Sequence, residues 1–569
     1  MSEHIDTIEE TPAAGPEGWP FAYAHPAAWD HEFEVLALPD MFARTAARVG
    51  DRPFIHFIGR SFTYAEIADQ IERAAEGFRR LGVERGVSVG LFLPNCPQYV
   101  IAYYAVMRAG GTVVNFSPLY SPDELEHQAR DAGVRIMVCL DLQQLFPAIA
   151  EVQRRGALDT LIVGNLPEVL PRLKGLAYRL LKRGDVAKVG YGKHRIPFAK
   201  LLNHGALQTA PVIDPAVDVA LIQYTGGTTG RPKGALLTHT NLSTNAQQVH
   251  AIDDDPGFQD RILGALPLFH VFANTCVLNR TVLAGDEMIM LPKFELEEAM
   301  TVISKERITA LPGVPTMYQA MLDHPKIDSF DLTCLRICIS GGAPMAQSLR
   351  DAFIDKTGAK LVEGYGLTES SGVTSVNPYA TGGKTGSIGQ PLPGTTIHIS
   401  DRDDSTKLLP IGERGEISIT GPQIMRGYWN RDDADAETFT AGRLRTGDVG
   451  YIDEDGFVFI VDRIKDLILV GGFNVYPSAL EEVLYQHDAV KEALVIGIDD
   501  TRLGQRPKAF VTLEEGDSVS EADLLSWLNK RVGKHERAAA LEIRTDLPKT
   551  MIGKLSRKEL VAEERARAD

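Results

Sequence analysis

The sequence predicts an α/β protein with a large N-terminal domain of parallel-rich sheets covered by helices, a β-rich subdomain and a small α+β C-terminal domain. Amphipathic helices alternate with short apolar strands through most of the chain, and short strands joined by polar turns begin near residue 385. A final segment that begins within "VDRIKD", residues 464–569, has the size of a separate domain. A chain of 569 residues also exceeds one ordinary domain.

The alternation of helix and strand is clearest early in the chain. "FTYAEIADQIERAAEGFRRLGV" places Ile67, Ile71 and Phe78 on one helical face, and Gly82 ends the pattern. "VSVGLFLPN" then predicts a buried strand, and "PQYVIAYYAVMRAGGTVVNFS" predicts a helix, a Gly-Gly turn and a strand. Because parallel strands are joined by crossover helices, this rhythm predicts parallel sheets with helices on both faces.

The later part of the chain changes in character. "IGQPLPGTTIHISDRDD", "GERGEISITG" and "GFVFIVDR" are short strand-like runs separated by polar turns. They predict a β-rich subdomain at about 385–460, attached to an N-terminal domain that spans residues 1–463. Residues 464–569 are then the C-terminal domain.

Charge and composition exclude several classes of protein. The formal net charge of −17, from 76 acidic and 59 basic residues, argues against general nucleic-acid binding. The first thirty residues lack the basic and apolar regions of a signal peptide, and no apolar run approaches the ~20 residues of a transmembrane helix. Five cysteines without a metal-binding spacing predict buried, reduced thiols in a cytoplasmic protein. They are Cys96, Cys139, Cys276, Cys334 and Cys338.

The stretch "YTGGTTGRPKG" at 224–234 is the strongest candidate for an anion site. It does not fit the Walker A pattern GxxxxGK[ST], because Arg231 and Pro232 stand where that pattern needs its second glycine and its lysine. Its flanks, "VDVALIQYT" and "GALLTHT", predict strand, loop and strand, whereas a Walker loop leads directly into a helix. Threonine hydroxyls and glycine amides can still wrap a polyphosphate, with Lys233 neutralising charge.

Six further motifs follow this loop in order. They are "ALPLFHVFA" at 265–273, "SGGAPM" at 340–345, "EGYGLTES" at 363–370, "RTGD" at 445–448, "VDRIKDLILVGGFNVYPSALE" at 461–481 and "PKTMIGKLSRKEL" at 548–560. With the loop, they resemble the adenylate-forming superfamily of acyl-CoA synthetases, peptide-synthetase adenylation domains and beetle luciferases. The resemblance covers nearly the whole chain. "NFSPLYSPDELEHQARDAG", "VNPY" and "GFNVYPSALEEVLYQHDAV" are most similar to bacterial long- and medium-chain fatty acid–CoA ligases.

This resemblance implies an ATP-dependent fatty acid–CoA ligase. The carboxylate would react with ATP to give an acyl-adenylate and pyrophosphate, and CoA would then give acyl-CoA and AMP. Because the first step joins two anions, positive charge and Mg²⁺ must be placed in advance. The resemblance places Thr225 and Glu369 at Mg²⁺, Thr368 at the α-phosphate, Tyr365 against adenine and His270 at the mouth of the acyl pocket.

The remaining nucleotide-binding residues are also implied by the resemblance. The loop would hold the β- and γ-phosphates, the two central motifs would surround adenine, and two later residues would contact ribose. In that order the residues are Thr225, Gly226, Gly227, Thr228, Thr229, Gly230 and Lys233, then Gly341, Gly342, Ala343, Pro344, Glu363, Gly364, Tyr365 and Gly366, and finally Asp448 and Arg463.

In the C-terminal domain, the resemblance implies that one region serves two half-reactions. Lys554 would reach the carboxylate and α-phosphate during adenylation, in the space that the CoA thiol needs afterwards. The domain would therefore rotate about a hinge at Lys465, after which Gly471 and Gly472 would line the pantetheine tunnel. Homodimers are also common in the superfamily.

Several alternatives remain open at the level of sequence. A luciferase-like oxygenase would share these motifs, a P-loop phosphotransferase is disfavoured by the flanks of the loop, and a non-catalytic binding protein would be expected to have lost Lys554 or Glu369. Asn274, Asn279 and Arg280 are polar in a segment that is usually apolar in fatty-acid enzymes. Either they face other elements, or Arg280 pairs with a second carboxylate of a pimelate-like dicarboxylic acid. An aryl acid is a further alternative substrate.

The segment from Leu170 to Arg195 carries eight Lys and Arg and one acidic residue. Pro171 can begin a helix and Gly184 can end it, with leucines on one side and basic residues on the other. One interpretation is a surface helix whose leucines pack on the large domain. The other is a patch that contacts an anionic membrane, where fatty acids partition.

Overall fold

The computed structural model of the chain describes residues 22–225, 232–471, 473–500, 502–514, 516–549 and 555–568. The chain divides into two compact units. The first comprises Met1–Thr385, Gly389–Thr396 and Thr420–Glu437, and the second comprises Gly386–Ile388, Ile397–Ile419 and Thr438–Asp569.

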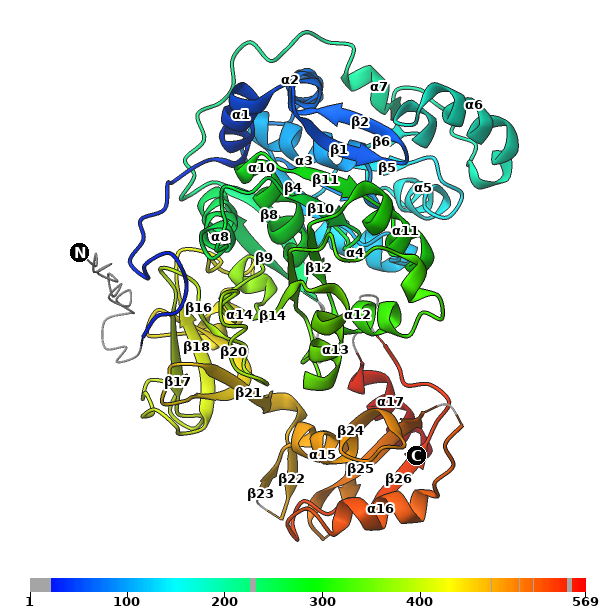
Figure 1. Cartoon of the computed structure of the whole chain (residues 1–569). Helices are drawn as coiled ribbons and strands as arrows, with labels where there is room; N and C mark the ends of the chain where they lie inside the picture. The colour runs from blue at the N-terminus through cyan, green and yellow to red at the C-terminus, as the bar shows by residue number, and fades with distance from the viewer. Residues whose placement is uncertain are drawn as a thin grey trace, which may run out of the picture. The chain divides into compact units, whose positions relative to one another are not determined.

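Two large sheets form the framework of the first unit (Figure 1). In the described residues one has seven strands, parallel except for the last pair. In spatial order these are β7 (Arg195–Pro197), β6 (Thr160–Gly164), β5 (Ile136–Leu140), β3 (Ser88–Phe92), β4 (Thr112–Asn115), β8 (Val219–Thr225) and β9 (Lys233–Thr238).

The second sheet of this unit has nine strands among the described residues, with a parallel centre and antiparallel strands at both ends. In spatial order these are β16 (Gln390–Pro391), β15 (Ser375–Val376), β14 (Lys360–Tyr365), β13 (Ile337–Ser340), β12 (Ala310–Gly313), β10 (Arg261–Gly264), β11 (Glu287–Met290), β1 (Pro53–Phe57) and β2 (Arg60–Thr63).

Helices cover these sheets. The α-helices of the first unit are α1 (Leu38–Val49), α2 (Tyr64–Arg80), α3 (Pro97–Arg108), α4 (Pro122–Asp131), α5 (Phe146–Arg154), α6 (Arg172–Leu181), α7 (Phe198–Leu201), α8 (His239–Ala251), α9 (Val271–Ala273), α10 (Arg280–Ala284), α11 (Leu296–Glu306), α12 (Pro315–Leu322), α13 (Gln347–Thr357) and α14 (Asp432–Thr438), which ends one residue beyond the unit. Short 3₁₀ turns are η1 (Leu166–Glu168), η2 (Arg183–Asp185), η4 (Ile327–Ser329) and η5 (Thr368–Ser370), and η3 (Asn274–Asn279) is a π-helix.

The core of the first unit explains why its sequence alternates as it does. α3 is buried from Pro97 to Met107, so it needs apolar residues around its whole circumference. α4 and α5 instead bury one face each, with Leu125 and Ile149 packed in the same cluster as Phe92 of β3. The predicted helices on sheets of mainly parallel strands are confirmed.

The second unit contains two five-stranded sheets among its described residues. The first is β17 (Thr396–Ser400), β18 (Gly415–Thr420), β20 (Arg443–Ile452) and β19 (Phe439–Thr440), with β21 (Val458–Arg463) also paired to β20. The second is β23 (Phe473–Val475), β22 (Ile468–Val470), β25 (Gly504–Leu513) and β24 (Val490–Asp500), with β26 (Ala540–Ile543) paired to β25. The 3₁₀ turn η6 (Ile464–Asp466) joins the two sheets.

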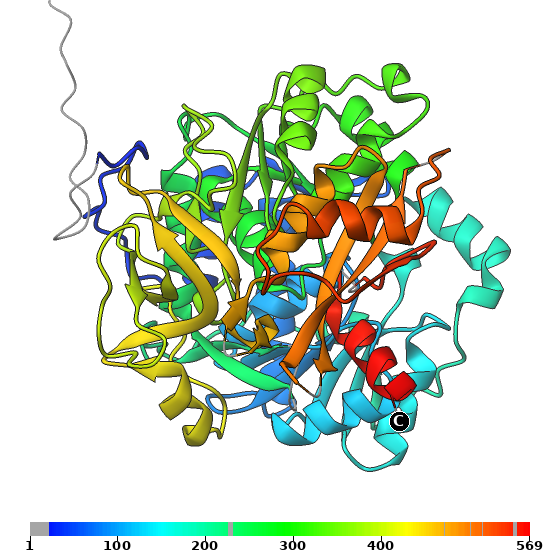
Figure 2. The ribbon, with the colours of Figure 1, turned by 90° about the horizontal axis from the view of Figure 1, so that it is seen from below.

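Three helices pack on the second of these sheets: α15 (Pro477–Tyr485), α16 (Glu521–Asn529) and α17 (Arg557–Ala568). Figure 2 shows α17, in red, beside the orange strands that include β24, which it contacts. Leu480 of α15 and Leu524 of α16 are buried with Val495 and Val511 in one core. These elements match the α+β character predicted for the last part of the chain.

The five cysteines are free thiols, as predicted. Four are buried, and burial raises the pKa of Cys96 to about 12. Cys334 is only partly buried, because it follows the exposed turn at Asp331 rather than lying within a strand. The prediction of burial was therefore wrong for this residue.

Candidate active site

The predicted phosphate loop lies between two paired strands of the first unit. β8 and β9 are antiparallel neighbours, and Thr225 is paired directly with Lys233. This confirms the predicted order of strand, loop and strand. Gly226, Gly227, Thr228, Thr229 and Gly230 lie outside the described residues. The described flanks therefore place one threonine and one lysine at the mouth of the loop.

The predicted adenine motifs follow two neighbouring parallel strands. β13 and β14 pair with Ser340 opposite Glu363, so the segment Gly341–Pro344 and the segment Tyr365–Gly366 leave the same edge of the sheet. Carboxyl ends of neighbouring parallel strands are where α/β folds build ligand sites.

Close packing requires a glycine at position 366 on this edge and leaves little room beside Gly341. A Cβ on Gly366 would lie 2.1 Å from the carbonyl oxygen of Gly372, and a Cβ on Gly341 would lie 3.1 Å from the ring of Phe272. The backbone between Tyr365 and Gly372 therefore folds into a tight loop that a side chain would open.

Glu363 interacts with the residue that follows the "GGAP" segment. Burial raises the pKa of its carboxyl to about 7, against the opposing effects of the Met345 N–H and the charge of Arg350. Within the segment, Ala343 is half-buried, whereas Gly342 and Pro344 are exposed.

Thr368 and Glu369 lie in η5, which contacts both β8 and β9. The structure therefore brings the predicted metal and α-phosphate residues to the strands that flank the phosphate loop. The amide of Met425 donates to the carbonyl oxygen of Glu369 at 2.8 Å. This backbone bond fixes the 3₁₀ turn to a segment that is distant in sequence.

Tyr428 joins Glu369 to Lys233. Its hydroxyl donates to Oε1 of Glu369 at 2.7 Å, and Nζ of Lys233 lies 4.3 Å from the centroid of its ring. Tyr428 is held by pairing along β9, where the amide of Trp429 donates to the carbonyl oxygen of Gly234 at 2.8 Å. Sequence reasoning missed this residue, because "RGYW" has no composition that marks a site and its partners are 59 and 195 positions away.

The helix after His270 is tied to the same loop. The amide of Asn274 donates to the carbonyl oxygen of His270 at 2.8 Å, and Oγ1 of Thr275 donates to the carbonyl oxygen of Ser371 at 2.6 Å. The ring of His270 lies 4.7 Å from that of Phe269, centroid to centroid. His270 therefore begins a helix whose next turn contacts Ser371, the residue that follows the "GYGLTES" segment.

The polar residues of this helix face other parts of the protein, as the first interpretation expected. Oδ1 of Asn274 accepts from the hydroxyl of Tyr103 at 2.9 Å, and Oδ1 of Asn279 accepts from the hydroxyl of Tyr104 at 2.9 Å. Both tyrosines belong to α3. The two asparagines thus satisfy buried hydroxyls between two helices.

Arg280 is buried among carboxylates of its own chain. Its Nη2 lies 2.8 Å from Asp253 and 3.0 Å from Asp260, and its Nη1 lies 3.5 Å from Asp286. Arg336 bridges the first two aspartates a second time. These ion pairs occupy Arg280, so its presence gives no support to a dicarboxylic acid substrate.

The predicted ribose and hinge residues lie in the second unit. Asp448 and Arg463 face each other across β20 and β21, with Nε of Arg463 3.0 Å from Oδ1 of Asp448. Asp448 is buried, whereas Arg463 is exposed. Lys465 is exposed in η6, and Gly471, with φ +57°, stands after β22. Gly472 and Lys554 lie outside the described residues.

The residues next to η6 are anchored to the C-terminal sheet and helices. Arg557 of α17 contacts Glu481 at 2.6 Å and Asp466 at 3.5 Å. The carboxylate of Asp462 accepts from the amide of Ser478 at 2.9 Å. These contacts end on either side of Lys465, which is therefore flanked by fixed residues.

Among the described residues, no three His, Cys, Asp or Glu side chains form a cluster suited to a metal. Mg²⁺ does not need such a cluster, because it is usually held by one or two carboxylates together with substrate phosphates. Glu369 is the carboxylate that the sequence predicts for this role. In the same part of the chain, no helix is both long and apolar enough to cross a membrane.

Comparisons with known proteins show that this chain is similar to known enzymes. A family model described as AMP-binding enzyme matches residues 42–429, and one described as AMP-binding enzyme C-terminal domain matches residues 479–554. A long-chain-fatty-acid–CoA ligase of Bacillus subtilis (strain 168) is 39% identical over 96% of this chain and 98% of its own length. A protein of the same name from Escherichia coli O6:H1 is 35% identical over 94% and 95%.

One further relative is named for a different acid. A feruloyl-CoA synthase of Amycolatopsis sp is 34% identical over 88% of this chain and 94% of its own length. Among solved structures, ATP-bound MatB from Rhodopseudomonas palustris has a TM-score of 0.81 and 28% identity, and the match covers 94% of this chain and all of that one.

Proposed function

Since this chain belongs to the family of AMP-binding enzymes and is an AMP-forming acid–CoA ligase, we propose that its substrate is a medium- or long-chain fatty acid. The observation that carries the proposal is the match, over nearly the full length of both chains, to ligases named for long-chain fatty acids. An aryl acid is the second candidate, favoured by the feruloyl-CoA synthase that matches over a shorter part of the chain.

The proposed reaction has two steps. A carboxylate oxygen of the acid attacks the α-phosphorus of ATP, and the bond from that phosphorus to the bridging oxygen of pyrophosphate breaks. The CoA thiolate then attacks the acyl carbon, and the bond from that carbon to the oxygen of AMP breaks. Because the first step brings negative charge onto negative charge, it depends on cations placed around the phosphates.

The residues at the β8–β9 hairpin suit that first step. Lys233 and Thr225 stand at the ends of the phosphate loop, and η5 contacts the same two strands. Glu369, with Thr225, would hold Mg²⁺, which supplies positive charge at the phosphates when bound. Thr368 would donate to the α-phosphate, and Tyr365 would stack on adenine beside the "GGAP" backbone.

We also propose that the chain divides functionally into residues 1–463 and 464–569, and that the latter rotates about Lys465 between the two steps. Asp448 and Arg463 would hold the ribose, and Gly471 and Gly472 would admit the pantetheine arm of CoA. The exposed position of Lys465 in η6, next to a C-terminal sheet that has a core of its own, supports a hinge there.

A fatty acid substrate also bears on where in the cell the enzyme acts. We propose a cytoplasmic enzyme that contacts an anionic membrane peripherally through residues 170–195, because fatty acids partition into bilayers. We expect a homodimer in solution, which light scattering at several protein concentrations would test.

The first test concerns the products. With ATP, Mg²⁺, CoA and a fatty acid, the enzyme is expected to release pyrophosphate and AMP in equal amounts with acyl-CoA, because the nucleotide loop lacks the Walker A sequence. Chromatographic quantification of nucleotides and thioester measures this. A series of straight-chain acids, α,ω-diacids and cinnamic acids then ranks the substrates. Stoichiometric ADP and phosphate would contradict the proposal, and highest activity on cinnamic acids would favour the aryl alternative.

Tyr428→Phe is expected to weaken the positioning of Glu369. Removing a hydrogen bond to a charged group costs about 1.5–3 kcal/mol, which corresponds to a loss of at least ~10-fold in adenylation at low Mg²⁺. Because the change acts through the proposed Mg²⁺ carboxylate, raising the Mg²⁺ concentration is expected to restore much of the rate. Pyrophosphate release measured across a Mg²⁺ titration tests this.

Tyr23→Phe is the matched control for this variant. The hydroxyl of Tyr23 is also buried and donates to the carbonyl oxygen of Pro391 at 2.7 Å, so its loss removes one hydrogen bond of similar length. It is expected to leave the Mg²⁺ dependence unchanged. A Tyr428→Phe enzyme with an unaltered Mg²⁺ curve would mean that Tyr428 does not position Glu369.

A further inference from the structure

The helix α6 has an apolar face that points away from the protein. Leu173 and Leu181 are 83% and 82% exposed, and Leu176 and Leu180 are each 57% exposed. The expectation that these leucines pack on the large domain is therefore wrong. A surface helix of a globular protein normally turns its apolar stripe toward the core, so this orientation needs a reason.

A narrow contact on the opposite side sets the orientation of α6. Gly175 is the one buried residue of the helix, and a Cβ there would lie 2.9 Å from the carbonyl oxygen of Pro167 in η1. Nζ of Lys174 also donates to the carbonyl oxygen of Ile58 at 3.0 Å. Because the glycine side approaches the protein so closely, the leucines on the far side are left in solvent.

Basic residues border this apolar face. At 3.6 residues per turn, Leu173, Leu176 and Leu180 lie together, with Lys174 on one flank and Arg172 and Arg179 on the other. In the described part of the chain, Arg172 and Arg183 form no ion pair, whereas Arg179 interacts with the carboxylates of Asp141 and Glu168. Lys182 lies 3.6 Å from the carboxylate of Asp185. A leucine face bordered by basic residues is the arrangement of helices that lie in a lipid interface.

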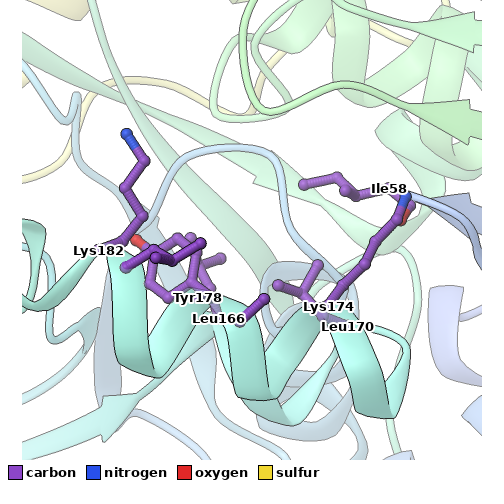
Figure 3. Close-up of a pocket in the computed structure, with 8 residues that line it drawn as sticks. Ile58, Leu166, Leu170, Lys174, Tyr178 and Lys182 are labelled. Carbon is purple, nitrogen blue, oxygen red and sulfur yellow. The ribbon is translucent and has the colours of Figure 1, made fainter.

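A groove beside α6 extends the apolar surface. It has a volume of about 280 Å³ and is lined by apolar side chains together with the stems of two lysines. Figure 3 shows Lys174 and Lys182 on opposite sides of the groove, with Leu166, Leu170 and Tyr178 between them. An occupant that fits is an acyl chain whose anionic end reaches an ammonium group.

We propose that α6 and this groove dock on the surface of a bilayer that contains anionic phospholipid. This inference rests on the proposed function, because a fatty acid substrate is concentrated in bilayers. The leucines of α6 enter the apolar boundary of the lipid, and Arg172, Arg179 and Lys182 contact the headgroups. The charge of −17 for the whole chain would repel such a surface, so the basic segment decides which face of the protein approaches it.

Vesicle sedimentation of the full chain tests the docking surface. With phosphatidylcholine vesicles that contain phosphatidylglycerol, the wild type is expected to pellet at low salt and to stay in the supernatant at high salt. Leu173→Ser with Leu176→Ser and Leu180→Ser, or Arg172→Glu with Arg179→Glu, is expected to reduce the bound fraction at least about tenfold. These side chains are exposed, so the fold is expected to be retained.

The controls are equally exposed residues elsewhere on the first unit. Val212→Ser removes another exposed apolar side chain, and Lys305→Glu with Lys326→Glu makes the same change of charge as the arginine variant. Both controls are expected to bind vesicles like the wild type. Acyl-CoA formation from a short, water-soluble fatty acid without vesicles is expected to be the same in all variants, which separates a failure of docking from a failure of the proposed function.

Four results would overturn the inference. The wild type does not pellet with anionic vesicles at low salt, or the leucine variant binds vesicles as well as the wild type does. Alternatively, the wild type binds only after fatty acid is added to the vesicles, or the leucine face serves only self-association. The last would show as a dimer in light scattering that the leucine variant loses, together with no binding of wild type to vesicles.

Discussion

Replacing Lys554 by alanine is expected to lower the rate of acyl-adenylate formation at least ~100-fold, while thioester formation from a supplied acyl-adenylate stays close to wild type. A group that stabilises charge developing in a transition state contributes about this much. In the proposed scheme Lys554 meets the carboxylate and α-phosphate only before the C-terminal domain rotates. Pyrophosphate release measures the first step, and CoA-dependent AMP release from acyl-adenylate measures the second.

Lys558→Ala is the matched control for this variant, because Lys558 is an exposed lysine on α17 and has no proposed role. It is expected to retain both half-reactions. If Lys554→Ala slowed both steps equally in a folded enzyme, the proposed rotation would lose its main support. Acetylation of Lys554 removes the same charge and is expected to stop adenylation in the same selective way.

Arg280→Leu is expected to destabilise the first unit by about 3–5 kcal/mol, because it leaves buried carboxylates without their shared partner. Asp253 and Asp260 would then keep Arg336 as their ion-pair partner, and Asp286 would lose the arginine that it contacts. Urea unfolding followed by fluorescence measures the change. Arg44→Leu, which breaks an exposed ion pair with Glu34, is the control and is expected to cost less than about 1 kcal/mol.

The decrease in the free energy of unfolding caused by Arg280→Leu is also expected to depend on pH. Burial already raises the pKa of Asp286 to about 7, although Arg280 opposes that shift. A carboxyl whose folded pKa exceeds its unfolded pKa favours folding at low pH, and this contribution is lost as pH rises through the folded value. Without Arg280 the shift is expected to grow, so the destabilisation should be larger at pH 8 than at pH 6. An equal loss at both values would mean that Asp286 does not take up a proton.

The parts of the fold that local sequence determines were predictable. Thr63 and Glu66 cap α2 through hydrogen bonds between residues three positions apart. The start of that helix is therefore determined by residues that are close together in the sequence. The hairpin of β8 and β9 follows in the same way from two strand-like runs around a short loop. The amino-acid sequence of the loop was also enough to distinguish this site from a Walker A site.

The parts that depend on distant contacts were not predictable. Nothing near Tyr428 marks it as a neighbour of Glu369, and nothing near Arg280 marks Asp253 as its partner, because each contact forms only when separate strands assemble. The spacing of residues in α6 predicted an apolar face and a basic face, but not which face contacts the protein. Helical periodicity shows which residues share a face and does not show which face is buried. The contact of Gly175 with Pro167 determines that direction.

The π-helix at Asn274–Asn279 affects how the number of residues before Arg280 relates to the position of its buried side chain. A π turn accommodates an additional residue within a helix, and each residue of an α-helix turns the chain by about 100°. Deleting one residue from this turn would therefore return it to α-helical geometry and leave Arg280 facing Asp253 and Asp260. Relatives with one residue fewer between His270 and Arg280 are consequently expected to have an uninterrupted α-helix there and to keep the arginine together with its aspartates.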